Sequence, residues 1–264
     1  MRMERGDGWE LREGDCLDPV SGLPSLESCD HVITDPPYAK AVYRSFRTNA
    51  GGGIRANGRA YSDGGALATA AEMAAERIGA IDDILDDCAA QFGRITRRWV
   101  AVWSDHASAH RWEAALVTAG LVWRRTDVWC KTDPMPQISA DRPAQGCEFY
   151  TLAHAKGRSR WNGGGRSGSY IGGTCKGAER PDHPSPKPLW LMEAQVRDLT
   201  DADDLVCDPF SGSGTTGVAC IRLGRRFVGF ERDAEYFEIA VKRLRMAREQ
   251  RELFPVTPAV GGEP

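Results

Sequence analysis

Short apolar runs alternate with amphipathic stretches along most of the 264-residue chain. Apolar runs bounded by turn residues are typical of buried strands, and apolar residues three and four apart are typical of helices. We expect strands within 9–13, 31–34, 97–105, 121–131, 148–156, 204–208 and 226–231. We expect helices over 66–94, interrupted near Gly79, and over 106–120, 189–199, 215–224 and 233–252. This alternation predicts an α/β fold whose sheet is mostly parallel, with helices on both faces.

Two glycine- and arginine-rich segments, 39–65 and 156–182, interrupt this pattern. Both are too polar to pack, so we interpret them as loop insertions in a single domain spanning residues 1–254. The segment 255–264 is expected to be a disordered tail. Four tryptophans in strand-like runs are expected to lie in the core: Trp99, Trp103, Trp123 and Trp129.

The composition is 41% hydrophobic and 27% charged, which is typical of a globular protein. No apolar run is long enough to span a membrane, and the first residues lack an apolar signal core, so a cytoplasmic location is expected. The eight cysteines include no CxxC pair and are interpreted as free thiols. No spacing of ligands indicates a metal site.

The formal net charge is −3, but basic residues gather in the two polar segments with almost no acids among them. Such segments would attract a polyanion if they lay on one face. Two solvated loops are an equally good interpretation of the same charges. The basic residues in question are Lys40, Arg44, Arg47, Arg55 and Arg59, and then Arg158, Arg160 and Arg166.

A glycine-rich turn, Asp208-Pro-Phe-Ser-Gly-Ser-Gly-Thr-Thr216, follows one expected strand and begins a helix. It lacks the lysine of a phosphate-binding P-loop. Glu231 ends the next strand, where a carboxylate suits hydrogen bonding to a ribose diol. Together the turn and Glu231 indicate an adenosine-containing cofactor.

A second motif, Asp35-Pro36-Pro37-Tyr38, directly follows an apolar strand that the prolines must end. Asp35 and the Pro36 carbonyl can both accept hydrogen bonds from one planar amino group, and Tyr38 can stack on the ring that carries it. The arrangement suits the exocyclic amine of a nucleobase. Taken alone, the same four residues are also typical of an ordinary turn after a strand.

These two motifs, with His183-Pro-Ser-Pro-Lys187-Pro188 between them, resemble the S-adenosylmethionine-dependent DNA amino-methyltransferases of the beta group. In that family the catalytic motif precedes the cofactor motif, a circular permutation of the Rossmann-like methyltransferase sheet, and this chain has the same order. The resemblance covers about residues 9–250. It implies that Asp35, Pro36, Pro37 and Tyr38 are catalytic and that His183 shapes a turn. The cofactor contacts that it implies are Asp15, Asp35, Lys187, Asp208, Phe210, Gly212, Ser213, Gly214, Thr215, Thr216 and Glu231.

The resemblance implies a site-specific DNA methyltransferase that flips adenine out of duplex DNA and methylates its N6 amine. The cytosine N4 amine is the alternative target, and a DNA-binding module without turnover is the alternative from another class. The implied partner is double-stranded DNA, contacted by the basic residues of both polar segments, with 156–182 as a short target-recognition region. Restriction–modification is the expected setting; a homodimer and a cognate nuclease are left open.

Overall fold

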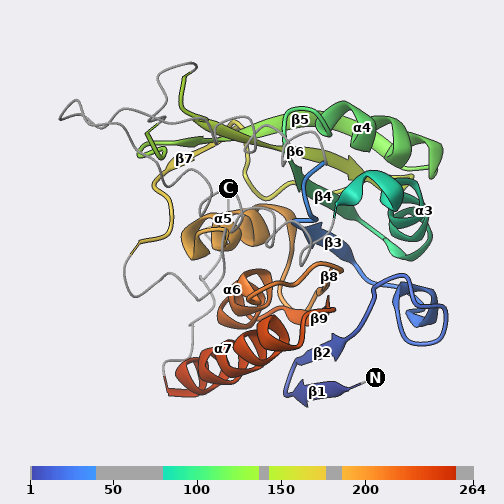
Figure 1. The fold of residues 1–264 in the computed structure, drawn as a ribbon, viewed down its shortest axis with the longest axis vertical. Helices are drawn as coiled ribbons and strands as arrows, with labels where there is room; N and C mark the ends of the chain where they lie inside the picture. Colours follow the sequence, from blue (N-terminus) through green and yellow to red (C-terminus); the bar gives the residue numbers. More distant parts are fainter. Residues whose placement is uncertain (1, 40–79, 137–142, 177–185, 254–264) are drawn as a thin grey trace, which may run out of the picture.

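A computed structural model describes residues 2–39, 80–136, 143–176 and 186–253 of the chain (Figure 1). Within these residues a nine-stranded sheet runs in the order β1-β2-β9-β8-β3-β4-β6-β5-β7. The strands are β1 (Met3–Gly6), β2 (Trp9–Glu13), β3 (His31–Thr34), β4 (Trp99–Ser104), β5 (Val122–Lys131), β6 (Cys147–His154), β7 (Tyr170–Gly172), β8 (Leu205–Asp208) and β9 (Arg226–Glu231). The helices are α3 (Leu85–Ile95), α4 (Ala109–Thr118), α5 (Leu189–Leu199), α6 (Thr215–Leu223) and α7 (Ala234–Leu253).

Five neighbouring strands, β2, β9, β8, β3 and β4, are parallel. Their carboxyl ends therefore meet at one edge of the sheet, here called the carboxyl edge. Strand β6 pairs antiparallel with both β4 and β5. It consequently begins at the carboxyl edge and ends at the opposite edge, here called the amino edge.

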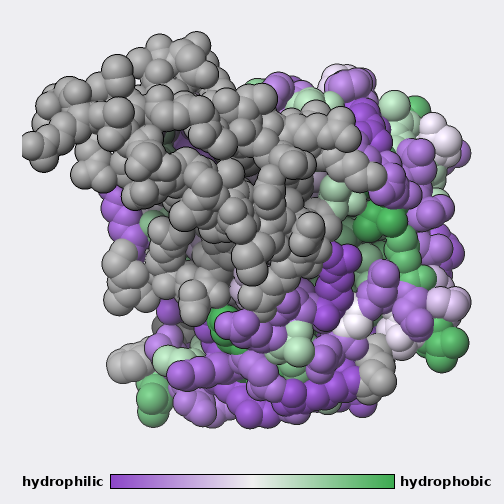
Figure 2. Space-filling view, in the orientation of Figure 1, coloured by the Kyte–Doolittle hydropathy of each residue, from purple (hydrophilic) through white to green (hydrophobic). Residues whose placement is uncertain are grey.

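Helices cover both faces of the sheet, with α5, α6 and α7 on one face and α3 and α4 on the other (Figure 1). Strand β4 is buried on both sides and serves both cores. Trp103 packs in the cluster with α5, α6 and α7, whereas Val100 and Val102 pack with Phe92 and Trp112 of α3 and α4. The expected fold class is thereby confirmed. The outward face of α7, along the lower border of Figure 2, is hydrophilic.

The structure departs from the sequence pattern in three places. Strands β1 and β7 were not expected, because each is short and has few apolar residues. Trp123 is 37% exposed, so its expected place in the core is wrong. The reason is that β7 pairs only with Trp129–Lys131 and leaves the first part of β5 at the border of the sheet.

Other expectations fall partly outside the described residues. The helix expected over 66–94 is described only from residue 80, as a short 3-10 turn at Ile81–Asp83 followed by α3. The segments 40–65 and 177–182 and the tail 255–264 lie outside the described residues. No helix in the described parts is long and apolar enough to cross a membrane.

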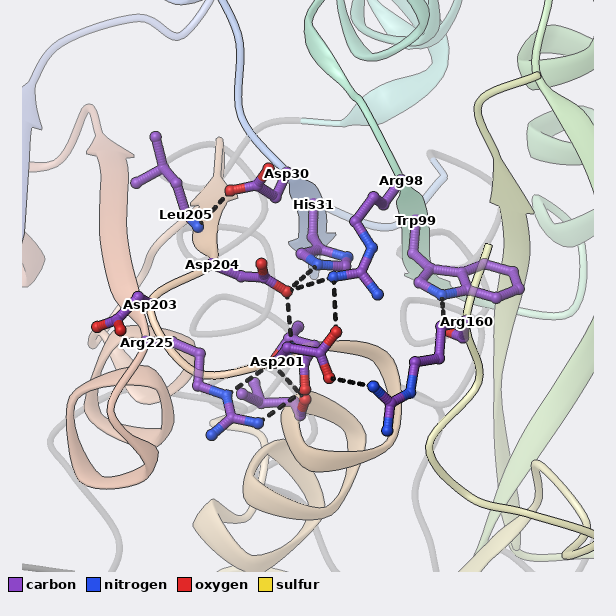
Figure 3. A network of polar contacts seen from close by, with 12 residues as sticks. Asp30, His31, Arg98, Trp99, Arg160, Asp201, Asp203, Asp204, Leu205 and Arg225 are labelled. Carbon is purple, nitrogen blue, oxygen red and sulfur yellow. Dashed lines mark hydrogen bonds and ion pairs between the residues drawn. The ribbon is translucent and has the colours of Figure 1, made fainter. Parts of the chain in front are cut away.

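A polar network joins the amino edges of β3, β4 and β8 (Figure 3). Asp204 accepts hydrogen bonds from His31 Nε2 at 2.9 Å and from Arg98 at 2.7 Å. Arg98 also pairs with Asp201 at 3.0 Å. Burial alone would raise the pKa of Asp204, but the bonds from His31 and the Asp201 amide, together with Arg98, hold it below its usual range. Burial lowers the pKa of His31, so its ring is neutral near pH 7.

Asp204→Ala is expected to lower the free energy of unfolding by about 2 kcal/mol, because the buried His31 loses its hydrogen-bond partner and Arg98 loses one of its two carboxylate partners. The pKa of Asp204 is lower in the folded chain than the ordinary 3.8, so its contribution is complete above about pH 5 and is lost as the pH falls through the folded-state value. Urea unfolding across this range measures both effects.

Asp7→Ala is the matched control, because Asp7 forms an ion pair with Arg248 at the exposed surface. That change is expected to cost less than about 1 kcal/mol. Equal losses in the two variants would contradict a stabilising role for the network.

Candidate functional site

Acidic residues stand at the carboxyl ends of all five parallel strands. Asp15 follows β2, Glu231 ends β9, Asp208 ends β8, Asp35 follows β3 and Asp105 follows β4. Since these strands are neighbours, residues far apart in the chain share one edge. Asp105 was not singled out from the sequence, although it ends its strand as Asp35 does. It anchors the start of α4 and accepts a hydrogen bond from the Ala39 amide at 3.1 Å.

The glycine-rich turn after β8 is held by Asp208, which is 2% exposed. Its Oδ1 accepts hydrogen bonds from Thr34 Oγ1 at 2.6 Å and from the Phe210 amide at 3.1 Å. Burial raises the pKa of Asp208 to about 6. Gly214 has φ of 79°, and a Cβ there would lie 3.0 Å from the Cβ of Ala240, so glycine is required where α6 begins. Thr216 is buried in the first turn of α6.

Glu231 connects this turn to the neighbouring strands. Its Oε2 accepts a hydrogen bond from the Gly212 amide at 2.7 Å, and its Oε1 accepts one from the Asp233 amide at 2.8 Å. Its carbonyl accepts from the Gly14 amide at 2.9 Å, which brings the exposed Asp15 to the same corner. Burial raises the pKa of the Glu231 carboxyl.

Arg243 of α7 supports the turn from behind and was not identified from the sequence. Its guanidinium donates to the Ser213 carbonyl at 2.5 Å, to Ser213 Oγ at 3.0 Å and to Thr215 Oγ1 at 3.1 Å. The sequence signal was an arginine next to the buried Val241 and Leu244 on an amphipathic helix.

Three buried polar atoms at the carboxyl edge have no hydrogen-bond partner among the described residues. One is Ser104 Oγ at the end of β4, and the other two are Ser211 Oγ and Asp35 Oδ1. The latter two atoms belong to the turns after the adjacent strands β8 and β3. Unpartnered buried polar groups are costly, which indicates that a polar ligand completes them. The glycine turn, Glu231 and these two atoms fit a cofactor that carries a ribose and an amino-acid group.

The Asp35-Pro36-Pro37-Tyr38 motif places Asp35 next to Lys187. Asp35 Oδ2 lies 2.5 Å from Lys187 Nζ, and the Asp35 side chain is 26% exposed. Burial raises the pKa of Asp35, with Lys187 opposing that effect. Pro36 is buried, and Tyr38 donates its hydroxyl hydrogen to Glu148 Oε2 at 2.9 Å. Burial raises the pKa of Tyr38 well above its ordinary value, so the phenol is neutral.

Glu148 and Lys131 belong to the same cluster and were missed from the sequence. Lys187 Nζ lies 2.9 Å from Glu148 Oε2, and Lys131 Nζ lies 2.5 Å from Glu148 Oε1. Burial would raise the pKa of Glu148, but the two lysines lower it to about 2. The carboxylates Asp35 and Glu148 outweigh burial and raise the pKa of Lys187. Lys187 thus lies against carboxylates, and its expected contact with the cofactor stays a prediction.

Comparison with known proteins agrees with these motifs. Residues 124–242 match the N6/N4 methyltransferase family model, described as DNA methylase. The Type II methyltransferase M2.LlaDCHI of Lactococcus lactis subsp. cremoris is 26% identical over 245 residues, which cover 83% of this chain and 82% of that protein. The Type II methyltransferase M2.DpnII of Streptococcus pneumoniae is 27% identical over 250 residues, covering 84% and 85%. The chain is thus similar to DNA amino-methyltransferases over most of its length.

Two solved structures share the fold of this methyltransferase. The M1.HpyAVI–SAM complex has a TM-score of 0.65 and 24% identity, and the alignment covers 89% of this chain and 98% of that chain. The PvuII DNA methyltransferase (cytosine-N4-specific) has a TM-score of 0.64 and 17% identity, with coverage of 96% and 88%.

The basic residues after β6 do not lie where the sequence led us to expect. Because β6 is antiparallel, Arg158 and Arg160 follow it at the amino edge, away from Asp35. There the Arg160 carbonyl accepts a hydrogen bond from Trp99 Nε1 at 2.7 Å, and its guanidinium lies 3.8 Å from Asp201 (Figure 3). These two arginines therefore lie away from Asp35, and their expected contact with DNA stays a prediction.

Arg166 forms an ion pair with Asp198 at 2.5 Å. Asp198 lies near the carboxyl end of α5, whereas Lys187 precedes the other end of that helix. His183 lies outside the described residues. So do the remaining basic residues predicted to contact DNA, which are Lys40, Arg44, Arg47, Arg55 and Arg59.

Arg243→Met is expected to weaken binding of the predicted cofactor, S-adenosylmethionine, by about tenfold, because the glycine-rich turn loses the hydrogen bonds that Arg243 Nη1 shares among its three acceptors. Isothermal titration calorimetry measures the affinity. Arg245→Met is the control, since Arg245 lies on the same helix, is 58% exposed and pairs with Glu4. Equal affinities of the two variants would contradict the supporting role of Arg243.

Proposed function

We propose that this methyltransferase transfers a methyl group from S-adenosylmethionine to the exocyclic N6 amine of adenine in duplex DNA. The observation that carries the proposal is Asp35 Oδ1, a buried acceptor without a partner in the described residues, at the carboxyl end of β3. It lies one strand from the glycine-rich turn of β8 and in the same motif as Tyr38. An acceptor, an aromatic ring and a cofactor turn together suit methylation of a base.

The bound cofactor would supply a methyl group on a positively charged sulfur, and the residues of this chain prepare the amine. The lone pair of an aryl amine is delocalised into its ring and attacks poorly. Hydrogen bonds accepted by Asp35 Oδ1 and the Pro36 carbonyl would draw the amine toward tetrahedral geometry and favour the positive charge that develops on it. Asp35 Oδ1 would also accept the proton that the amine releases.

Tyr38 would supply the surface on which the target base stacks. Its phenol is neutral and is tied to Glu148, so the ring is oriented before any base enters. The amine cannot be reached inside a duplex, so the base must leave the helix at a cost of about a few kcal/mol. Stacking on Tyr38 and hydrogen bonding to Asp35 would offset that cost.

Cytosine N4 is the second candidate, because its amine would meet Asp35 in the same way and one structure with this fold is named cytosine-N4-specific. The Asp-Pro-Pro-Tyr form of the motif favours adenine, whereas cytosine enzymes of the family more often begin the motif with serine. The relatives' designation as Type II methyltransferases favours a restriction–modification setting with a cognate nuclease. Sedimentation of the purified chain would establish whether it forms a homodimer.

The test is incubation with methyl-labelled S-adenosylmethionine and mixed-sequence duplex DNA, followed by nucleoside digestion and mass spectrometry. Labelled 6-methyladenine is the expected product. Labelled 4-methylcytosine would replace the proposed target with the second candidate. Cofactor binding without any labelled nucleoside would contradict methylation of DNA and favour the non-catalytic alternative.

Asp35→Ala is expected to reduce labelling by about 10³-fold, because the acceptor for the target amine is removed. Its affinity for S-adenosylmethionine is expected to stay within about threefold of the original, since the glycine-rich turn is held by other residues. Asp35→Asn is the matched variant that keeps the shape and removes the charge. Labelling by the alanine variant at the original rate would rule out Asp35 as the catalytic acceptor.

Arg44→Ala with Arg47→Ala is expected to weaken DNA binding more than about tenfold and to reduce the salt slope by about 2. Arg158→Ala with Arg160→Ala is expected to change the affinity less than about twofold, because these residues follow β6 at the amino edge. Fluorescence anisotropy between about 50 and 200 mM salt compares the two pairs. A larger loss from the second pair would place the DNA at the amino edge instead.

A further inference from the structure

Lys187 joins two carboxylates that come from different strands. Its Nζ lies 2.5 Å from Asp35 Oδ2 and 2.9 Å from Glu148 Oε2. The Lys187 side chain is only 5% exposed, and its ammonium also lies 5.6 Å from the ring centroid of Trp103. A lysine this buried is held in one place by its partners, so it fixes the geometry of both carboxylates.

The two oxygens of Asp35 are therefore not equivalent. Oδ2 is occupied by Lys187, whereas Oδ1 has no hydrogen-bond partner among the described residues. An ion pair on one oxygen limits rotation of the carboxylate and leaves the other oxygen to accept from an incoming group. Lys187 thus decides which oxygen of Asp35 meets the target amine.

Glu148 links Tyr38 to Lys187. Glu148 Oε2 accepts from both the Tyr38 hydroxyl, at 2.9 Å, and Lys187. Its other oxygen pairs with Lys131 at 2.5 Å. One carboxylate therefore connects the stacking ring to the lysine that holds Asp35.

We propose that Lys187 is a positioning residue for methyl transfer, which orients Asp35 and keeps it an acceptor, and that Glu148 holds Lys187 and Tyr38 in register. The inference rests on the proposed function, because it concerns the amine that Asp35 receives. It differs from the cofactor contact that the sequence motif implies for Lys187.

Charge balance supports this role. Two carboxylates, Asp35 and Glu148, are matched by two ammonium groups, Lys187 and Lys131. Without Lys187, two carboxylates would share a buried site with one lysine, and Asp35 would bind a proton more readily. A protonated carboxyl donates a hydrogen bond from one oxygen and accepts less well. Asp208 at the end of β8 and Asp105 near Tyr38 add negative charge in the same direction.

Lys187→Met is expected to slow single-turnover methylation by about 100-fold while S-adenosylmethionine affinity stays within about threefold. The acid limb of the rate-against-pH profile is expected to move up by about one unit, because Asp35 loses a neighbouring positive charge. Glu148→Gln is expected to move the same limb down, because Asp35 loses a neighbouring negative charge. Lys242→Met, at an exposed position on α7, is the control for all three measurements.

Thermal stability gives a readout that does not require methylation. Lys187→Met alone is expected to lower the melting temperature, since it leaves Asp35 without its partner. Adding Asp35→Asn to Lys187→Met is expected to recover at least half of that loss, because the unpaired charge is then removed. If Lys187→Met fails to fold, Glu148→Gln and the double variant still test the proposal.

Three results would overturn the proposal. A matching loss of S-adenosylmethionine affinity in Lys187→Met would assign Lys187 to the cofactor. An acid limb that moves in neither variant would show that Lys187 and Glu148 do not act on Asp35. Additive losses of melting temperature would show no coupling between Asp35 and Lys187. Failure of the proposed function can be told apart from failure of this inference. In the former case the unaltered protein would label no DNA, while the thermal coupling between Asp35 and Lys187 would persist.

Discussion

The parallel alignment of β2, β9, β8, β3 and β4 is the constraint on which the site depends. Parallel strands joined through helices end at the same edge, so residues distant in the chain are brought together there. Asp15, Asp35, Asp105, Asp208 and Glu231 meet at this edge although more than 200 positions separate the first from the last. The order of motifs along the chain therefore matters less than the order of strands in the sheet.

This convergence concentrates negative charge, which the structure balances in two ways. Backbone amides and hydroxyls satisfy Asp208 and Glu231 around the glycine-rich turn. Lysines pair with Glu148 and with one oxygen of Asp35, and they come from the end of β5 and from just before α5. The half of the edge proposed to bind the cofactor is thus built from dipoles, and the half proposed to bind the base is built from ion pairs. This would suit a positively charged cofactor group in one half and an amine that becomes positive in the other.

The two edges of the sheet divide stability from chemistry. At the amino edge His31 Nε2 and Arg98 both donate to Asp204 and join three strands, although His31 Nδ1 has no partner in the described residues. At the carboxyl edge Asp35 Oδ1 and Ser211 Oγ are left without partners in the described residues. Unsatisfied atoms at a binding edge reduce stability but provide contacts for a ligand. The fold tolerates them because its strands are secured at the opposite edge and by cores on both faces.

The sequence by itself determined seven of the nine strands in the described residues, most helices, the glycine-rich turn and the Asp35 motif. These depend on local apolar periodicity and on proline and glycine chemistry. It did not determine the direction of β6, since an alternating or apolar run reads the same in a parallel and an antiparallel strand. That direction brings Glu148 to Lys187 and carries Arg158 and Arg160 to the amino edge. The pairing of Lys131 with Glu148 and the exposure of Trp123 were likewise decided by which strand lies beside β5. Only tertiary structure could settle these contacts, because each joins residues whose own neighbours in the chain carry no sign of the partner.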